Sequence, residues 1–334
     1  MSKEWMNEGA GEVKRHVKTI ASVAFLVVAL GLLVAAVVKQ WSDFTRAVGL
    51  IDAQTLLLAL FAAVVAQFTS VMASRESLAA TSHRIPVAQV ARAFLTAALG
   101  KYVPGAVWPV AAQMELMKRN GVPRTHSAVA AVLTMTIGLG AAVVAGVLGV
   151  FLSGGSIAKY WWLVPIAAMC FAALWPGLLT WVLRLVARVG WRFRAFGEVS
   201  VGGRPLLGAT AWSLLGAVSN GFQTWVIVRA ISTSGTANFW LALGAAQLAF
   251  AVGFVIIIAP GGIGPREAVL VALLGPIAGT SGALAVAIIS RLAQIAIDCL
   301  GALVALLLSR RHRHDDVAFQ RGETFTEADG RRSP

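Results

Sequence analysis

Lys101-Tyr102-Val103-Pro104-Gly105 and Ala259-Pro260-Gly261-Gly262-Ile263-Gly264 interrupt two apolar stretches of this 334-residue chain. Proline and glycine end a helix, and a helix that ends inside hydrocarbon leaves backbone N–H and C=O groups without partners. Such breaks persist only where they face buried protein or a water-filled cavity. Two interrupted segments in corresponding positions of two halves are typical of a transporter with a binding site at the membrane midplane.

The composition indicates a polytopic membrane protein. Hydrophobic residues make up 58% of the chain and charged residues only 13%, which is far from the composition of soluble globular proteins. Six apolar stretches approach or exceed the ~20 residues that a helix needs to cross a bilayer. They are residues 20–38, 53–73, 127–152, 161–183, 206–228 and 282–308. We interpret the first as a retained signal anchor, because it is too long for a signal-peptide core and no cleavage site follows it.

The basic residues predict the side of the membrane on which each loop lies. If the N-terminus is cytoplasmic and each broken segment enters and returns on one side, most of the 28 Lys and Arg residues lie in cytoplasmic segments. The outer loops then hold only Lys39, Arg46, Lys159 and Arg229, as the positive-inside rule requires. The charges do not separate a re-entrant hairpin from two complete short crossings. The short arms favour hairpins.

The order of span, hairpin and span occurs twice, in residues 53–152 and 206–308. Since the first hairpin then enters from the cytoplasm and the second from outside, the pattern predicts an inverted repeat. We expect an all-α polytopic membrane protein with six full transmembrane helices and two broken helical hairpins. A cytoplasmic segment, 1–19, precedes the transmembrane domain, 20–309. The polar segment 310–334 is expected to be a disordered cytoplasmic tail.

Polar residues near the first break are candidates for substrate binding. Lys101 stands next to the break, and charge inside a membrane is costly and usually functional. Arg92, Gln113 and Glu115 lie close by in sequence, and the spacing of Glu115 and Arg119 suits an i, i+4 ion pair. The alternative is that the basic residues here only extend to the cytoplasmic surface and bind nothing specific.

The second break is followed by Gly264-Pro265-Arg266-Glu267, which opens a half-helix. The N–H groups and positive dipole of such an end can hold a phosphate, and Arg266 can add a bidentate contact. The alternative is that Arg266 and Glu267 only cap and pack the hairpin. The residues expected to shape the two breaks are Pro104, Gly105, Pro260, Gly261, Gly262 and Gly264.

The last span carries Arg291, Gln294 and Asp298 at spacing i, i+3 and i+7, which places them on one helix face. An embedded arginine and an embedded aspartate two turns apart can face a common cavity, and they are functional candidates by default. Single embedded amides such as Gln67 and Gln247 more often join helices to one another.

Several chemistries lack a signal in the sequence. The chain contains no G-x-x-x-x-G-K-[ST] motif, and its five histidines never fall at metal-ligand spacing with cysteines or acids. No extramembrane segment is long enough for a soluble catalytic domain. We therefore expect no cofactor, no metal and no enzymatic activity of the chain itself.

The residues around both breaks resemble a known family. Gly100-Lys101-Tyr102-Val103-Pro104-Gly105-Ala106-Val107-Trp108, followed by Lys118-Arg119-Asn120-Gly121-Val122, resembles the first signature of the flippase-like membrane family that includes the transmembrane region of lysyl-phosphatidylglycerol synthases. Pro260-Gly261-Gly262-Ile263-Gly264-Pro265-Arg266-Glu267-Ala268 resembles the second. The similarity covers about residues 20–308. It implies a protein that moves a lipid or lipid-linked sugar between leaflets.

Two departures limit what the resemblance implies. The soluble aminoacyl-transferase portion of the full-length synthases is absent from the sequence, so lysine transfer is not implied. Gln113 stands where we expect many relatives to have a basic residue. Charge-based selection of a headgroup at that position is therefore not implied either.

The leading hypothesis is a lipid flippase in the plasma membrane, with both termini cytoplasmic and an anionic phospholipid or polyprenyl-phosphate-linked sugar as substrate. Lys101, Arg266 and Arg291 would contact the phosphate, while Glu115, Glu267 and Asp298 balance charge or couple protons. The alternatives are an intramembrane enzyme acting on a lipid-linked substrate, and an accessory subunit of an envelope-synthesis complex. Anionic lipids at the cytoplasmic face and envelope-synthesis enzymes are the other expected partners; nucleic acid is not.

Overall fold

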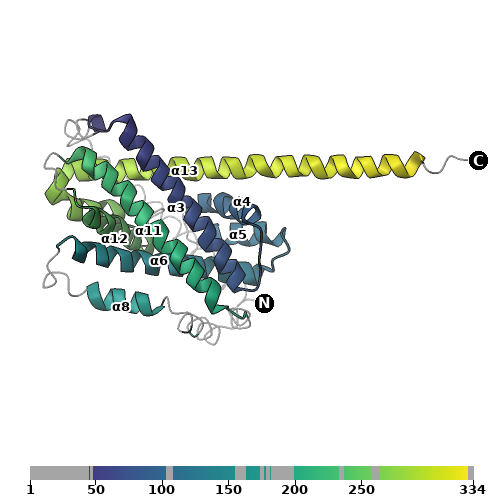
Figure 1. Cartoon of the computed structure of the whole chain (residues 1–334), viewed down its shortest axis with the longest axis horizontal. Helices are drawn as coiled ribbons and strands as arrows, with labels where there is room; N and C mark the ends of the chain where they lie inside the picture. The colour runs from purple at the N-terminus through teal and green to yellow at the C-terminus, as the bar shows by residue number, and fades with distance from the viewer. Residues whose placement is uncertain are drawn as a thin grey trace, which may run out of the picture.

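The computed structural model describes residues 45, 48–102, 108–154, 163–173, 177, 181, 199–232, 237–256 and 264–329. These residues form helices and the turns between them, and no strand occurs among them (Figure 1). The all-helical prediction is confirmed for this part of the chain. The first predicted span, 20–38, lies outside it.

Helices α3 (Ala53–Ala80) and α11 (Gly203–Ile231) form the largest helix contact in the structure. The Gly202 N–H donates to the Ala80 carbonyl at 2.8 Å, so the end of α3 meets the start of α11 and the two helices run antiparallel. Asp52 caps α3 by accepting from the Thr55 N–H at 2.8 Å. Hydrogen bonds from Thr55 lower the pKa of the Asp52 carboxyl, because they stabilise its ionised form.

The first hairpin consists of α4 (Val87–Ala98), the short η1 (Leu99–Tyr102) and α5 (Trp108–Lys118). Its two arms pack against each other. They approach so closely that a Cβ at Gly100 would lie 2.9 Å from the Pro109 nitrogen. Both ends of this hairpin lie at the C-terminal end of α3. Helix α6 (Arg124–Leu152) begins there too, since His126 Nδ1 lies 3.1 Å from the Thr81 carbonyl oxygen.

The second hairpin consists of α12 (Phe239–Val255) and the first part of α13 (Pro265–Asp329). Gly279, at φ 69° and ψ 164°, divides α13 into two parts, and a residue with a side chain rarely adopts this conformation. Both ends of this hairpin lie at the C-terminal end of α11. The Trp225 Nε1–H donates to the Ala237 carbonyl at 3.0 Å, and the Ser232 hydroxyl donates to the Ile277 carbonyl at 3.3 Å.

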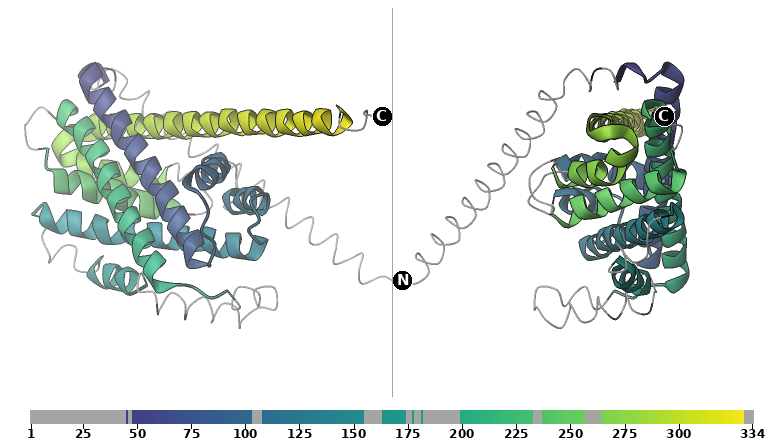
Figure 2. Two further views of the ribbon diagram at one scale, coloured as in Figure 1. Left: turned by 45° about the vertical axis from the view of Figure 1, so that its right-hand side comes forward. Right: turned by 90° about the vertical axis from the view of Figure 1, so that its left-hand side faces the viewer.

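The two hairpins therefore enter the bundle from opposite ends, because α3 and α11 are antiparallel. Each hairpin also packs against the other half of the chain: α12 contacts α6, and α4 contacts α13. Figure 2 shows α4 and α5 side by side on the flank of the bundle, beneath the second part of α13.

The predicted spans are only partly confirmed. Among the described residues, three helices are long and apolar enough to cross a membrane: Ala53–Ala80, Arg124–Leu152 and Pro265–Leu307. Helix α11 is 29 residues long but is not in this group, and it carries Asn220 and Gln223 in its second half. Of the predicted span 161–183, the structure describes chiefly α8 (Leu163–Ala173).

Helix α13 extends into the C-terminal segment. Helix α13 continues to Asp329, over residues for which the composition predicts a disordered tail, and projects beyond the other helices (Figure 1). No proline occurs between Pro276 and Pro334, so nothing in the sequence ends the helix sharply, and adding a residue to an existing helix needs no new nucleus. Residues 330–334 lie outside the described residues.

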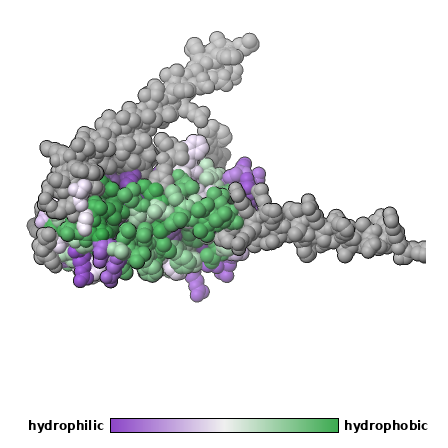
Figure 3. All heavy atoms as spheres, turned by 90° about the horizontal axis from the view of Figure 1, so that it is seen from above, coloured by the Kyte–Doolittle hydropathy of each residue, from purple (hydrophilic) through white to green (hydrophobic). Residues whose placement is uncertain are grey.

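Large apolar side chains cover the outside of the bundle. Leu57 and Phe61 of α3 are 67% and 65% exposed, and Figure 3 shows a broad hydrophobic surface with hydrophilic residues near its margins. A contiguous apolar surface of this extent is stable only against an apolar environment such as lipid. This agrees with the membrane location that the composition predicts.

Candidate functional site

Asp298, in the second part of α13, is fully buried and forms an ion pair with the first hairpin. Its Oδ2 lies 2.6 Å from Lys101 Nζ, and the two side chains are 0% and 40% exposed. Lys101 occupies the last turn before the first break, in η1. Lys101, the candidate residue next to the first break, is therefore paired with a buried carboxylate on a distant helix. An ammonium near a buried carboxylate offsets part of the cost of removing that carboxylate from water.

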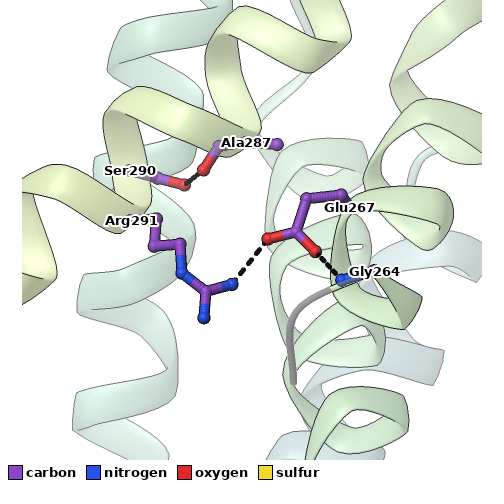
Figure 4. Close-up of polar contacts among 5 residues, drawn as sticks. All are labelled: Gly264, Glu267, Ala287, Ser290 and Arg291. Carbon is purple, nitrogen blue, oxygen red and sulfur yellow. Dashed lines mark hydrogen bonds and ion pairs between the residues drawn. The ribbon is translucent and has the colours of Figure 1, made fainter. Parts of the chain in front are cut away.

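Glu267 forms a second ion pair at the start of α13. Its Oε1 accepts from Arg291 NH1 at 2.7 Å, and the Arg291 and Glu267 side chains are 15% and 5% exposed. Its other oxygen, Oε2, accepts from the Gly264 N–H at 2.6 Å, as Figure 4 shows. One carboxylate thus joins the second break to the second part of α13.

The contact to Gly264 is a helix cap. Pro265 follows at the first helical position and Glu267 at the third, where a glutamate can reach back to the capping residue. Gly264 itself has φ 95°, which favours glycine. The sequence predicts that the N–H groups at this helix end are open to a phosphate. At Gly264 this prediction needs correction, because the Gly264 N–H already donates to the Glu267 carboxylate. Glu267 thus caps the helix and also pairs with Arg291.

Arg266 lies on the first turn of α13, between the capping residue Gly264 and the ion-paired Glu267. It is half-buried, and its Nε is shielded from solvent. Arg266 therefore carries a partly buried guanidinium on the helical turn that follows the second break. A guanidinium carries five donors in a planar fork, which suits the oxygens of a phosphate.

The predicted helix face on α13 is confirmed, and it joins the two hairpins. Arg291 pairs with Glu267 of the second hairpin, and Asp298 pairs with Lys101 of the first. Gln294 lies between them and donates from Nε2 to Asp298 Oδ1 at 3.5 Å. Arg291 and Asp298 are seven residues apart, which is about 10 Å along a helix. Arg291 therefore contacts the second hairpin, and Asp298 contacts the first.

Three predicted site residues lie apart from these pairs. Gln113 is buried, and its Nε2 donates to the Ser74 hydroxyl at 3.3 Å, so it joins α5 to α3. Arg92 donates from Nε to the Ala88 carbonyl of its own helix at 3.2 Å. Glu115 pairs with Arg124 at 2.6 Å rather than with Arg119, because the turn between α5 and α6 brings Arg124 to it. Both side chains of that pair are more than half exposed.

The break residues themselves fall largely outside the described part of the chain. This holds for Pro104, Gly105, Pro260, Gly261 and Gly262. The structure does define the residues that flank both breaks, Lys101 before the first and Gly264 at the end of the second.

Sequence reasoning missed the identity of the partners in both ion pairs. Lys101 and Asp298 are almost two hundred positions apart, and Glu267 and Arg291 are separated by the kink at Gly279. One signal was available, because a charge embedded in a membrane is usually paired with a charge of the opposite sign.

One comparison with known proteins bears on these residues. A family model described as the lysylphosphatidylglycerol synthase TM region matches residues 20–301, which include both hairpins and both ion pairs. No curated protein matches the chain.

Proposed function

Because the chain belongs to the lysylphosphatidylglycerol synthase transmembrane-region family, we propose that it moves an anionic phospholipid or a polyprenyl-phosphate-linked sugar between the two leaflets of the plasma membrane. The headgroup would pass through the polar interior near the two breaks while the acyl or polyprenyl chain stays in the bilayer. Lys101, Arg266 and Arg291 would contact the phosphate. Glu267 and Asp298 hold two of these cations in place.

The observation that supports this proposal best is the pair of ionic contacts between the hairpins and α13. Four charged side chains meet along one helix face, and two of them, Glu267 and Asp298, are almost fully shielded. Buried ion pairs stabilise a fold weakly compared with apolar side chains of similar size, because both charges must lose their hydration. Charges kept in a membrane protein at such a cost are by default functional.

We include an inverted repeat with six full spans in the proposal, and the packing of the described helices supports the repeat. Each element of residues 53–152 has a counterpart in residues 206–308, and the cross-contacts match: α4 contacts α13 as α12 contacts α6. The hairpins also enter from opposite ends. A pseudo-twofold axis in the membrane plane, running between α3 and α11, relates these features.

Basic residues support a cytoplasmic location for the end of the bundle where α3 ends and α6 and α11 begin. This end also holds the last residues of α5. Its Lys and Arg residues are Arg75, Arg84, Lys118, Arg119, Arg124 and Arg204. By the positive-inside rule, this end faces the cytoplasm, where anionic lipids would surround it. The N- and C-termini would then be cytoplasmic.

A reconstitution experiment tests the function. Purified protein is placed in vesicles that contain either fluorescent phosphatidylglycerol or fluorescent polyprenyl phosphate, and a membrane-impermeant quencher reports the outer-leaflet fraction over time. We expect faster exchange between leaflets than in protein-free vesicles for at least one lipid. The combined substitution K101Q with D298N should slow it at least about tenfold. The control E76Q changes a carboxylate of the separate Arg75–Glu76 pair on α3 and should leave exchange intact.

The same protein in detergent separates transport from enzymatic turnover. Micelles have no leaflets, so a transporter leaves both lipids chemically unchanged there. Equal exchange in protein-containing and protein-free vesicles, for both lipids, would rule out the proposal.

A further inference from the structure

The two ion pairs on α13 lie at different depths in the bundle. Arg291 and Asp298 are separated by two helical turns, about 10 Å along the axis. Side chains on a helix lean toward its N-terminus, so both lean the same way and the separation is retained at their tips. Their partners come from different hairpins, which enter from opposite ends. The two pairs therefore offer their cations at two different points along α13.

We propose that the ion pairs are two phosphate-binding stations used one after the other by the same headgroup. Station one is Lys101 with Asp298, and station two is Arg291 with Glu267. The proposal rests on the lipid transport proposed above and specifies its path. Because α13 runs from Gly279 at the outer end toward the cytoplasmic end, Asp298 lies closer to the cytoplasm. A headgroup from the cytoplasmic leaflet would therefore reach station one first.

Each station suits reversible binding of an anion. An ammonium has three donors and a guanidinium five, so each cation can hold its carboxylate and a phosphate oxygen at the same time. The carboxylate keeps its cation in position and also repels the incoming phosphate, which limits the affinity. Limited affinity is what a transport path needs, because binding must be weak enough for the headgroup to leave.

Gln294 supplies a polar side chain between the stations. Its position, three residues after Arg291 and four before Asp298, places it on the same face, and its amide contacts Asp298 at 3.5 Å. An amide carries both donors and acceptors, so it can hydrogen-bond a phosphate without adding charge. We assign Gln294 as a positioning residue, because its amide offers the headgroup a polar contact between the two stations.

The test disables each station without leaving an unpaired buried charge. Station one is removed by K101Q with D298N, and station two by R291Q with E267Q. The four substitutions together remove both, and E76Q is the matched control. The probe is whichever of fluorescent phosphatidylglycerol and fluorescent polyprenyl phosphate the unmodified protein transports in vesicles. Its binding to each variant is measured in detergent micelles, and its transport is measured in vesicles.

We expect each station variant to bind the probe no more than about tenfold more weakly than the unmodified protein, since the other station remains. The four-substitution variant should lose binding. Transport should fall at least about tenfold in either station variant, because the stations act in series. Correct insertion is checked by thermal unfolding in detergent, with midpoints compared against that of E76Q.

Two results would overturn the stations while leaving lipid transport in place. If either station variant loses binding as completely as the four-substitution variant, both cations form one site. If either variant keeps half or more of the transport rate, the path does not run through both. A failure of the unmodified protein to transport either probe would instead remove the proposed function, and the stations with it.

Discussion

Gly149 of α6 and Gly244 of α12 lie in backbone contact. A Cβ at Gly149 would lie 2.6 Å from the Gly244 nitrogen, and a Cβ at Gly244 would lie 2.8 Å from the Val150 nitrogen. Glycine is thus what allows the second hairpin to approach the first half of the chain. Membrane helices often pack through such small residues, because van der Waals contact replaces the hydrophobic effect as the driving force.

The first prediction concerns this contact. Gly149→Ala should lower stability by about 1–3 kcal/mol, because the added methyl meets backbone atoms that cannot move aside. Gly138→Ala is the control, since Gly138 lies on the same helix with nothing within 4 Å of an added Cβ. It should be neutral or slightly stabilising. Thermal unfolding in detergent, followed by circular dichroism, compares the two; equal midpoints would contradict the contact.

A second prediction compares two ion pairs of nearly equal length. Arg291–Glu267 measures 2.7 Å and is mostly buried, whereas Arg124–Glu115 measures 2.6 Å and is exposed. Arg291→Gln should cost on the order of 3 kcal/mol, because it leaves Glu267 buried without its cation. Arg124→Gln should leave the unfolding midpoint unchanged within error. Adding E267Q to Arg291→Gln should restore much of the lost stability. An equal effect of the two single substitutions would show that burial does not govern these pairs.

The third prediction concerns Arg266. A guanidinium binds phosphate through a planar fork that an ammonium cannot reproduce. Arg266→Lys should therefore reduce lipid exchange in vesicles several-fold, and Arg266→Ala should abolish it while the protein inserts at normal levels. Exchange at the unmodified rate by Arg266→Ala, at equal protein density, would mean that Arg266 only packs the hairpin.

The fourth prediction concerns the orientation of the hairpins. Single cysteines at residues 121–124, in the turn between α5 and α6, should react with an impermeant thiol reagent from the cytoplasmic side. Cysteines at residues 278–281, around the kink in α13, should react from outside. The parent protein should first have Cys170 and Cys299 replaced by alanine. Labelling of both regions from one side would contradict the inverted repeat.

Helical periodicity was enough to predict which residues of the candidate site share a face of α13. Arg291, Gln294 and Asp298 share that face whatever the helix packs against, because their spacing alone determines it. The partners of Arg291 and Asp298 depend on how the hairpins pack, and no local pattern encodes that packing. The same reason explains Glu115: i, i+4 spacing favours Arg119, but the following turn brings Arg124 closer.

The helix caps show a similar limit. The sequence Gly264-Pro265-Arg266-Glu267 predicts a helix start, and the structure contains one. The same sequence is compatible with an open anion site and with a cap that uses its own carboxylate. The tertiary structure decides between them. One oxygen of Glu267 accepts from the Gly264 N–H, and the other accepts from Arg291, so Glu267 is both a cap and an ion-pair partner.

The kink at Gly279 gives α13 a mechanical role. It is the single residue with non-helical backbone angles between Pro265 and Asp329, so it is the point at which two helical rods can change their relative angle. One rod carries Glu267 and the other carries both Arg291 and Asp298. A rotation of the second rod that separates Arg291 from Glu267 therefore also shifts Asp298 against Lys101. Movement of this one rod would therefore disturb a contact to each hairpin at the same time.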